Sequence, residues 1–465
     1  MDYRIEKDVL GEIKVPNDAY WGVNTQRAID NFQISNKRFS KNFIQSLAEV
    51  KKAAFLANKD LGSISEEKSK AIMQAIDEIL NQQMYFDQFP IDVFQTGSGT
   101  QMNMNMNEVL ANRANEILGH EKGKKSPVHP NDDVNMSQSS NDVIPTTMHI
   151  SALHSMKERL FPTLDKLQAV LNQKIKEFKD VLKVGRTHLQ DAVPIPLSLE
   201  FKVYKQQIEI NRKRFESDFE ELRAIPLGGT VLGTGINATK DFQDLVIKKL
   251  IEVTGFSLRA KEILAEGIAS HNTIVKLSST INLLALSLIK MANDIRWMGS
   301  GPRAGLSELI LPANEPGSSI MPGKINPTQS EALIQVCLHI MGNYTSISNS
   351  EMMGSILDLN ICKPIMIHNL LESIDLICNG IDSFIDKCLV GLEVNQSKIK
   401  DDLDNLLMIA TNLNPYIGYD KASEIAQKAY HEGKNIKQVV LEMGLKFEED
   451  LDKILDPKRT ITSGG

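Results

Sequence analysis

Most of the chain has the spacing of amphipathic helices, with apolar residues returning every three or four positions. One such segment opens at Ser65, followed by two glutamates, and places Ile72, Ile76 and Ile79 on one face. The same pattern predicts helices at 103–118, 141–178, 197–222, 265–297, 327–342 and 365–390, with a kink at Pro162. The first forty residues are mixed, with a short extended piece at 13–15. We therefore expect a mainly α fold.

The segment 265–297 predicts an assembly of several chains. Its apolar residues fall on every side of the helix: Ile274, Val275, Leu277, Ile281, Leu283, Leu284, Leu286, Leu288, Ile289 and Met291. A helix that is apolar all round is normally buried all round. At about 1.5 Å per residue it would extend for roughly 50 Å, which is more than one short bundle covers. A bundle of long helices shared between chains explains this, and a large helical core within one chain is the alternative.

Three parts follow one another along the chain. Beyond residue 395 the helical segments become shorter and more charged, through NPYIGYDKA and AQKAYHEGK. We expect an elongated subunit with a mixed, mainly helical domain at 1–138, a central long-helix bundle domain at 139–395 and a small helical domain at 396–465.

Composition and charge exclude several classes of protein. The 465 residues carry a net charge of −7 without a basic patch or tail, which argues against a nucleic-acid binder or a protein of anionic membranes. No apolar run approaches the roughly 18 residues of a membrane-spanning helix, since the longest, 283–289, contains Ser287. The N-terminus has neither the apolar core of a signal peptide nor the bias of a transit peptide. We therefore expect a cytoplasmic protein.

The four cysteines predict no redox or cluster chemistry. Cys337, Cys362, Cys378 and Cys388 form no C-x-x-C pair, and each lies in an apolar helical context. Buried, reduced thiols are the expected state. This spacing disfavours an iron–sulfur cluster as the Lewis acid of a hydratase.

Four segments interrupt the helical pattern with hydroxyl and amide residues. They are QTGSGTQMNMN at 95–105, HPNDDVNMSQSSND at 129–142, GRTHLQDA at 185–192 and EPGSSIMPGKINPTQ at 315–329. Each alone has an ordinary structural explanation, as a turn, a capped helix start, a core histidine or a solvated lysine. Three of them precede a predicted helix, whose unpaired N–H groups attract anions. Together they suit a small polyanion such as a dicarboxylate, and no phosphate-loop pattern competes.

The segment 315–329 contains residues that make the backbone flexible and residues that make it rigid. Gly317 and Gly323 let the backbone turn and approach a ligand closely, while three prolines limit its conformations. Lys324 supplies a positive charge where a carboxylate gathers negative charge. The Asn-Pro-x-Gln at 326–329 predicts a helix start with a cap, a first-turn proline and a capping-box glutamine.

These motifs resemble one known family along essentially the whole chain. GSSIMPGKIN at 317–326 resembles the signature loop of the fumarase/aspartase superfamily. TGSGTQMNMNMNE, HPNDDVN, SQSSND, GRTHLQDA and NPYIGYDKA are most similar to class II fumarate hydratase of the fumarase C type. Aspartases usually have a glutamine where this chain has His188. An aspartate ammonia-lyase is the alternative within the superfamily, and an inactive structural homologue is an alternative from another class.

The resemblance implies a reaction and an assembly. The implied reaction is the reversible anti hydration of fumarate to L-malate, a step of the tricarboxylic acid cycle, through a carbanion (aci-carboxylate) intermediate and without metal or cofactor. The implied assembly is a homotetramer built on the long central bundle, with each active site shared by three subunits. Nucleic acids and membranes are not expected as partners.

The resemblance also implies roles for individual residues. Ser318 would be the base, Lys324 would stabilise the charged intermediate, and His188 with Glu331 behind it would handle the leaving hydroxide. The implied substrate-binding residues are Ser98, Gly99, Thr100, Ser139, Ser140, Asn141, Thr187, Ser319, Lys324 and Asn326. An accessory anion site would comprise His129, Asn131 and Asp132. Met136 replaces a lysine common in the family, and Ser126 an arginine found in some members.

Overall fold

The computed structural model describes residues 2–461 and is mainly α, as predicted, with sheets of only two strands each in this part of the chain. The chain divides into two compact units, each made of three segments. The first unit comprises Met1–Pro162, Lys213–Leu283 and Leu338–Cys378, and the second comprises Thr163–Arg212, Leu284–Cys337 and Asn379–Gly465. The predicted three-part division follows chain order and stays a prediction.

The helices of the first unit are α1 (Val23–Asn31), α2 (Lys41–Asp60), α3 (Glu66–Leu80), α4 (Thr100–Ile117), α5 (Ser140–Ser155), α8 (Lys240–Thr254) and α9 (Glu266–Ala269). Helices with residues in both units are α6 (Phe161–Glu177), α7 (Leu197–Leu222), α10 (Asn272–Met298), α11 (Thr328–Gly354) and α12 (Lys363–Phe384). The second unit adds α13 (Gln396–Asp404), α14 (Asn414–Ile417), α15 (Tyr419–Glu432), α16 (Ile436–Glu442) and α17 (Leu451–Ile454). Within residues 2–461, four of the five strand pairs are antiparallel.

The strand pairs are short. They are β1 (Tyr3–Asp8) with β2 (Gly11–Pro16), β3 (Leu182–Thr187) with β4 (Gln190–Pro196), β5 (Ala224–Ile225) with β6 (Arg259–Ala260), β7 (Leu309–Ile310) with β10 (Glu393–Val394), and β8 (Ser355–Ile356) with β9 (Leu359–Asn360). The expected extended piece at 13–15 is part of β2, and its partner β1 was not predicted.

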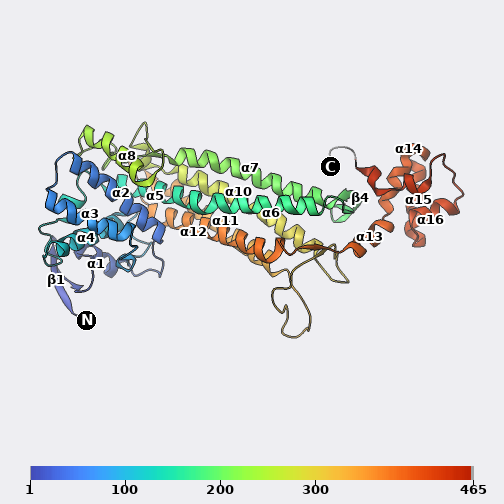
Figure 1. Ribbon diagram of the computed structural model, residues 1–465, viewed down its shortest axis with the longest axis horizontal. Coiled ribbons are helices and arrows are strands. Elements are labelled where there is room, and N and C mark those ends of the chain that lie inside the picture. The colour runs from blue at the N-terminus through green and yellow to red at the C-terminus, as the bar shows by residue number, and fades with distance from the viewer. Residues whose placement is uncertain (1, 462–465) are drawn as a thin grey trace. The chain divides into compact units, whose positions relative to one another are not determined.

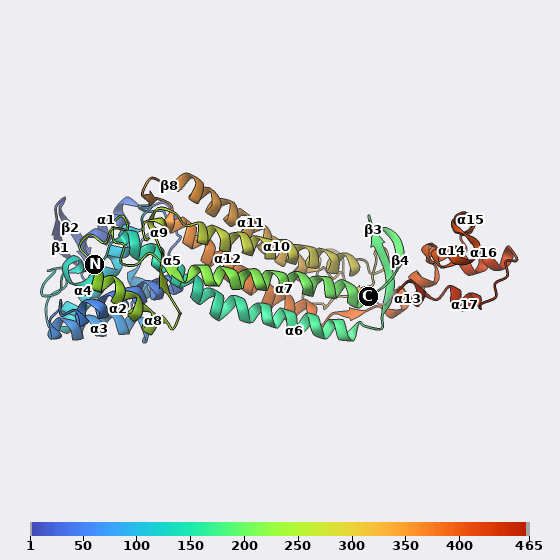
Figure 2. The same ribbon diagram turned by 90° about the horizontal axis from the view of Figure 1, so that it is seen from above.

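The core of the first unit forms around α2, which packs against α3, α5 and α8 (Figures 1 and 2). Phe43 and Leu47 of α2 are fully buried. The predicted face of α3 is buried as well, since Ile72, Ile76 and Ile79 are inaccessible to solvent. Burial of each such side chain stabilises the fold by about 1.5–3 kcal/mol. This core holds the starts of α4 and α5, on which part of the candidate site lies.

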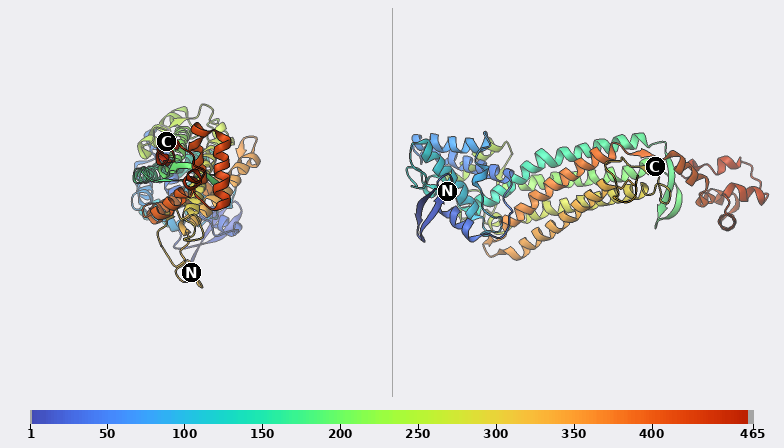
Figure 3. Two further views of the ribbon diagram at one scale, coloured as in Figure 1. Left: turned by 90° about the vertical axis from the view of Figure 1, so that its right-hand side faces the viewer. Right: turned by 90° about the horizontal axis from the view of Figure 1, so that it is seen from below.

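In the second unit, the C-terminal helices α14–α17 form a small cluster with an apolar core of its own (Figure 3). Leu413, Ile425, Val439 and Ile454 are fully buried in it. The long helices of this unit are joined by polar side chains: the Tyr204 hydroxyl of α7 donates to Asp294 of α10 at 3.0 Å. The segments beyond residue 395, which were expected to be shorter and more charged, form the short helices α13–α17.

One predicted helix is divided. The pattern at 265–297 predicts a single helix, but α9 ends at Ala269 and α10 begins at Asn272. The carboxylate of Glu351 accepts hydrogen bonds from the Ser270 hydroxyl at 2.7 Å and from the His271 backbone N–H at 3.0 Å. Glu351, eighty positions away, therefore binds the His271 N–H group that a continuous helix would use for its own backbone hydrogen bond.

Other predicted helix ends shift. Helix α4 begins at Thr100 rather than 103, because Gly99, in the left-handed region at φ +77°, ends the preceding loop. Helix α11 continues past Gly342 to Gly354. An added Cβ at Gly342 would meet open space, and one exposed glycine costs a helix only about 1 kcal/mol. In 141–178 a π-helical turn at Met156–Leu160 separates α5 from α6, which begins one residue before Pro162.

Helix α10 is not buried all round within one chain. Leu277, Ile281 and Leu288 are fully buried, whereas Leu286 and Trp297 are 46% and 50% exposed. By length and hydropathy α10 passes the test for a membrane-crossing helix, which the uninterrupted apolar runs did not predict. Half of its most apolar window is buried inside the chain, and core helices of soluble proteins pass the same test.

Three cysteines are buried as predicted. Cys337, Cys378 and Cys388 lie in the core, while Cys362 is half-buried. Burial raises the pKa of the Cys337 and Cys388 thiols to about 12. These thiols stay protonated at neutral pH and are therefore unreactive.

Candidate active site

In the first unit, three hydroxyls from two motifs form a chain. The Oγ1 of Thr100, the first residue of α4, lies 2.7 Å from Ser98 Oγ and 2.8 Å from Ser140 Oγ. Ser140 is the first residue of α5. Glycine suits the position between the first two hydroxyls, because its φ is +77° and a Cβ would lie only 3.0 Å from the Ile144 side chain. Two helix N-termini with their partial positive charges therefore lie beside a row of hydroxyls, which suits a carboxylate.

A capping box fixes the start of α5. The Ser139 side chain caps the helix, and its backbone N–H donates to Asp142 Oδ1 at 3.0 Å. Asp142 Oδ2 accepts from the backbone N–H groups of Gly228 at 3.0 Å and Thr230 at 2.9 Å. Burial raises the pKa of Asp142 to about 6, although these donors favour the charged form. The sequence analysis did not identify Asp142, whose signal was its position three residues after the serine cap.

A buried lysine supports the loop before α5. Lys51 of α2 donates to Asn135 Oδ1 at 3.0 Å and to Gln138 Oε1 at 2.9 Å. Asn103 and Asn107 of α4 donate to the same Asn135 oxygen at 3.1 and 3.0 Å. Burial lowers the pKa of Lys51 to about 7. The sequence analysis did not identify this network, because Lys51 is followed directly by Lys52 and nothing local marks it as the buried one of the two.

Met136, at the position where the resemblance implies a lysine, is held through its backbone. Its carbonyl accepts from Asn58 at 3.0 Å and from the Gln138 side chain at 3.1 Å. The loop therefore keeps its form with a neutral side chain at this position.

The proposed accessory residues lie together at another helix start. His129 caps the π-helical turn Pro130–Val134, and its Nδ1 accepts from the backbone N–H groups of Asn131 and Asp132, both at 3.2 Å. His129 thus has an ordinary structural role at a helix start. An anion site at these residues stays a prediction.

In the second unit, GRTHLQDA forms the β3–β4 hairpin, which the sequence analysis did not predict. Thr187 pairs with Gln190, so His188 and Leu189 form a two-residue turn. Their φ angles are +56° and +59°, the left-handed region that such turns usually fill with Asn or Gly. Thr187 and His188 are exposed at the tip. The hairpin thus presents both predicted site residues outward.

The segment 315–329 folds back on itself in the second unit. The Gly317 N–H donates to the Lys324 carbonyl at 2.8 Å, and the Asn326 side chain donates to the Gly317 carbonyl at 2.6 Å. A Cβ on Gly317 would lie 2.5 Å from the Lys324 oxygen, so only glycine allows this closure. Ser318 Oγ accepts from the backbone N–H groups of Ile320 at 3.2 Å and Met321 at 3.0 Å.

The expected capping box at 326–329 does not form. Gln329 Oε1 accepts a hydrogen bond from the Ser383 hydroxyl of α12 at 2.7 Å instead of reaching back to the helix start. Pro327, predicted in the first turn, directly precedes α11, and its carbonyl accepts from the Glu331 N–H at 3.1 Å. Helix packing therefore overrides the local capping signal.

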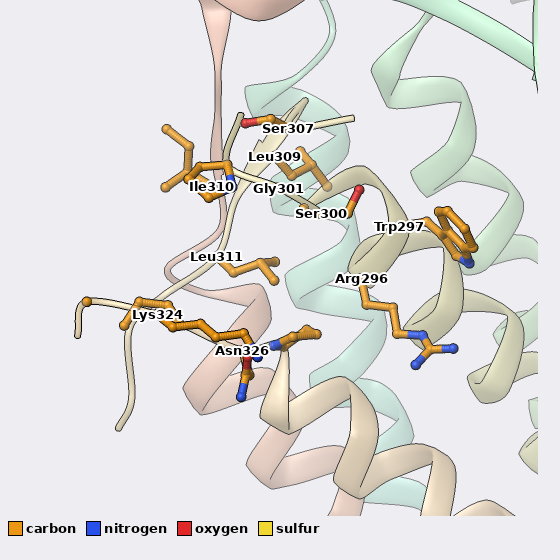
Figure 4. A pocket seen from close by; sticks show the side chains of 15 residues that line it. Arg296, Trp297, Ser300, Gly301, Ser307, Leu309, Ile310, Leu311, Lys324 and Asn326 are labelled. Atoms are coloured by element: carbon orange, nitrogen blue, oxygen red, sulfur yellow. The ribbon is translucent and has the colours of Figure 1, made fainter. Parts of the chain in front are cut away.

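A cavity of about 630 Å³ opens beside this segment (Figure 4). Lys324 and Asn326 line one part of it, and Arg296 and Trp297 at the end of α10 line another (Figure 4). No carboxylate is among its lining residues within the described part of the chain. The cavity is therefore positively charged and suits an anion.

The predicted pairing of His188 with Glu331 is not formed within one chain. Both side chains belong to the second unit and both are exposed. No hydrogen bond or ion pair joins them within residues 2–461. Of the other predicted residues of this unit, Ser319 and Lys324 are exposed as well, while Ser318 and Asn326 are half-buried.

The comparisons with known proteins agree with the motifs. A sequence model of the family described as Lyase matches residues 11–342, and one described as Fumarase C C-terminus matches residues 409–461. The chain is 49% identical to "Fumarate hydratase class II" of Thermosynechococcus vestitus over 452 residues, 97% of this chain and 96% of that protein.

Two crystal structures are similar over almost the whole chain. Recombinant class II fumarase from Schistosoma mansoni matches with a TM-score of 0.94 and 38% identity over 98% of both chains. A structure described as fumarate lyase:delta crystallin from Brucella melitensis bound to cobalt matches with a TM-score of 0.94 and 40% identity over 99% of both chains. The resemblance inferred from the motifs is confirmed, and the chain belongs to the lyase family and, within it, to the class II fumarate hydratases.

Proposed function

We propose that this chain catalyses the reversible anti hydration of fumarate to L-malate. The observation that carries the proposal is the hydroxyl chain of Ser98, Thr100 and Ser140 at two helix N-termini, in a full-length relative of class II fumarate hydratases. Hydroxyls and helix N-termini bind a carboxylate without needing a metal or cofactor. Gly99, Ser139, Asn141 and Thr187 complete the substrate-binding set, together with Ser319, Lys324 and Asn326.

The proton at C3 of malate leaves to Ser318. That proton is weakly acidic, so the adjacent carboxylate becomes doubly charged as an aci-carboxylate in the intermediate. Enzymes lower barriers by about 8–23 kcal/mol, whereas one oriented donor supplies only about 3–4 kcal/mol. Lys324, Asn326 and several N–H groups therefore act together on that carboxylate.

Serine is a poor base in water, and its loop compensates for this. The backbone N–H groups of Ile320 and Met321 already point at Ser318 Oγ and would stabilise its alkoxide. The left-handed Gly323 and the tight contact at Gly317 allow the loop to close over substrate and exclude water.

His188 donates a proton to the departing hydroxyl group of malate, which leaves as water. An imidazole titrates near neutrality and is suited to this proton transfer. Glu331 orients the ring and favours its charged form. Because both side chains are exposed in a single chain, we assign them to different subunits of one site.

The assembly is a homotetramer whose sites are each shared by three subunits. The exposed apolar side chains Leu286 and Trp297 of α10 support a core made from several copies of this helix. We further propose that the enzyme works in the cytoplasm, in the tricarboxylic acid cycle, and that His129, Asn131 and Asp132 form an accessory anion site.

The test is to follow absorbance of the fumarate double bond with purified protein and two separate substrates. Formation of fumarate from L-malate and not from L-aspartate supports the proposal. Formation from L-aspartate alone would assign the chain to the ammonia-lyases, and no turnover of either substrate by a folded tetramer would indicate an inactive homologue.

A further inference from the structure

Four charged side chains lie behind the hairpin that presents His188. All four belong to the second unit: Lys183 and Arg186 come from β3, Glu200 from α7, and Glu308 directly precedes β7. The side chains of Lys183 and Glu308 are only 2% and 1% exposed. A buried carboxylate is normally retained only with partners, and here Lys183 and Arg186 both lie beside Glu308.

Glu308 holds both cations at once. Its Oε1 accepts from Arg186 Nη1 at 2.5 Å, and its Oε2 lies 3.3 Å from Lys183 Nζ. Its backbone is fixed in turn, because its N–H donates to the Met298 carbonyl at 2.8 Å and its carbonyl accepts from Asn395 at 2.9 Å. Glu308 is therefore a rigid anchor on which two side chains of β3 converge.

The two cations lie on either side of an irregularity in the hairpin. The strand register shifts between Val184 and Arg186, and a Cβ on Gly185, between them, would approach the Val193 carbonyl to 2.7 Å. A register shift changes the local twist and the direction of the side chains that follow. By binding Lys183 before the shift and Arg186 after it, Glu308 fixes the path of the strand towards its tip.

The tip needs such support. His188 and Leu189 both have positive φ, which costs a residue other than glycine conformational energy and persists only where surrounding contacts impose it. Because the tip is exposed, few contacts there can impose these φ angles. Arg186, which Glu308 binds, lies only two residues before His188.

We infer that Glu308 is a positioning residue: through Arg186 and Lys183 it holds the strained turn that aims His188 at the substrate. This rests on the proposed role of His188. The Glu308 side chain is buried and does not line the cavity beside Lys324 and Asn326, so we expect its loss to act on the proton-transfer step.

The test compares Glu308→Gln with Glu200→Gln. The Glu308→Gln change keeps the size of the side chain but removes the charge that holds both cations. Glu200 is the matched control, because its Oε1 accepts a hydrogen bond from Lys183, one of these two cations, at 3.1 Å. For Glu308→Gln we expect kcat for L-malate to fall by about 100-fold with a much smaller change in KM, since a misplaced catalytic group costs that much. Glu200→Gln should keep most of its kcat.

Leu189→Gly separates positioning from a merely structural role. Leu189 is exposed, and glycine adopts its positive φ without strain. Leu189→Gly added to Glu308→Gln should restore part of kcat, because the turn no longer needs to be forced. If Glu308→Gln is not obtained as a folded tetramer, Arg186→Met takes its place in the same comparison.

Two results would overturn the inference. One is a kcat of Glu308→Gln that equals that of the parent enzyme. The other is a loss of kcat in Glu308→Gln that the added Leu189→Gly change does not relieve. Activity of the parent enzyme on L-malate is measured first. Absence of that activity contradicts the proposed function, so the two failures are distinguishable.

Discussion

The hydroxyls of Thr100 and Ser140 lie 2.8 Å apart, although the two residues are forty positions apart and open different helices. This contact brings the N-termini of α4 and α5 together. Each terminus has the equivalent of about half a positive charge. The pair is therefore the structural basis for carboxylate binding in the first unit.

Removal of either hydroxyl of this pair should weaken catalysis in a coupled way. Thr100→Val and Ser140→Ala each lose a contact of about 1–1.5 kcal/mol, so kcat/KM for L-malate should fall about tenfold in each. The double variant should lose less than the product of the single effects, because either change breaks the same contact. Steady-state kinetics measure this. Thr147→Val, which removes a buried hydroxyl bonded to the Val143 carbonyl in α5, is the control.

Strictly additive losses would contradict the coupling of the two helix starts. A fall in KM on removal of either hydroxyl would contradict substrate binding there.

A charge on the exposed side of α10 should break the assembly. Leu286 is 46% exposed in one chain, and in the proposed tetramer it is buried against other copies. Burial of an unpaired carboxylate is costly, so Leu286→Glu should yield smaller species without activity. Light scattering would detect the parent as four chains of 51.8 kDa. Val9→Glu, at a fully exposed position of the β1–β2 turn, should remain tetrameric.

Two inactive variants should restore each other when mixed within one tetramer. Ser318→Ala lacks the base and His188→Asn lacks the proton-transfer group, so each alone should be nearly inactive. If these residues come from different subunits, hybrid tetramers contain some sites with both groups intact. Co-expressed chains with two different tags, purified through both tags, should regain a measurable fraction of the parent's kcat. Hybrids that remain as inactive as the separate variants would indicate that each site lies within one subunit.

The ion pairs of His154 should make stability depend on pH. Burial alone would lower the pKa of His154, but Glu49 and Glu158, each 3.0 Å from the ring, outweigh it and raise the pKa above its ordinary value. A raised pKa in the folded state means that the stabilisation is full below the unfolded-state value, about 6.5, and is lost as pH rises through the folded-state value. Thermal unfolding of His154→Gln should therefore show a larger loss of stability at pH 5.5 than at pH 9.

The exposed His120 serves as the matched control, since His120→Gln should change stability little at either pH. Equal destabilisation by His154→Gln at both pH values would contradict the charged pairing.

Local patterns predicted much of the fold. The apolar spacing identified α3 with its buried face and gave both ends of α7, because burial of one helix face leaves a direct trace in sequence. It failed where a distant residue decides the outcome, as Glu351 does at the break before α10. The hairpin at His188 was missed because its turn contains neither glycine nor asparagine.

The candidate site divides in the same way. Hydroxyl and glycine motifs identified the residues at the starts of α4 and α5, because their chemistry is visible locally. Lys51, Asp142 and Glu308 were missed, since partners that hold them in the folded chain lie far away in the sequence. The pairing of His188 with Glu331 does not arise in one chain, so it needs the assembly.

The central claim is the hydration of fumarate with Ser318 as the base, and the most direct test is to run the reaction in heavy water. The product is examined by proton nuclear magnetic resonance for deuterium at C3, whose position relative to the new hydroxyl shows the geometry of addition. The parent should give L-malate with one deuterium at C3, added anti to the hydroxyl, and Ser318→Ala should give almost none. Syn or mixed labelling by the parent, or full activity of Ser318→Ala, would contradict the account.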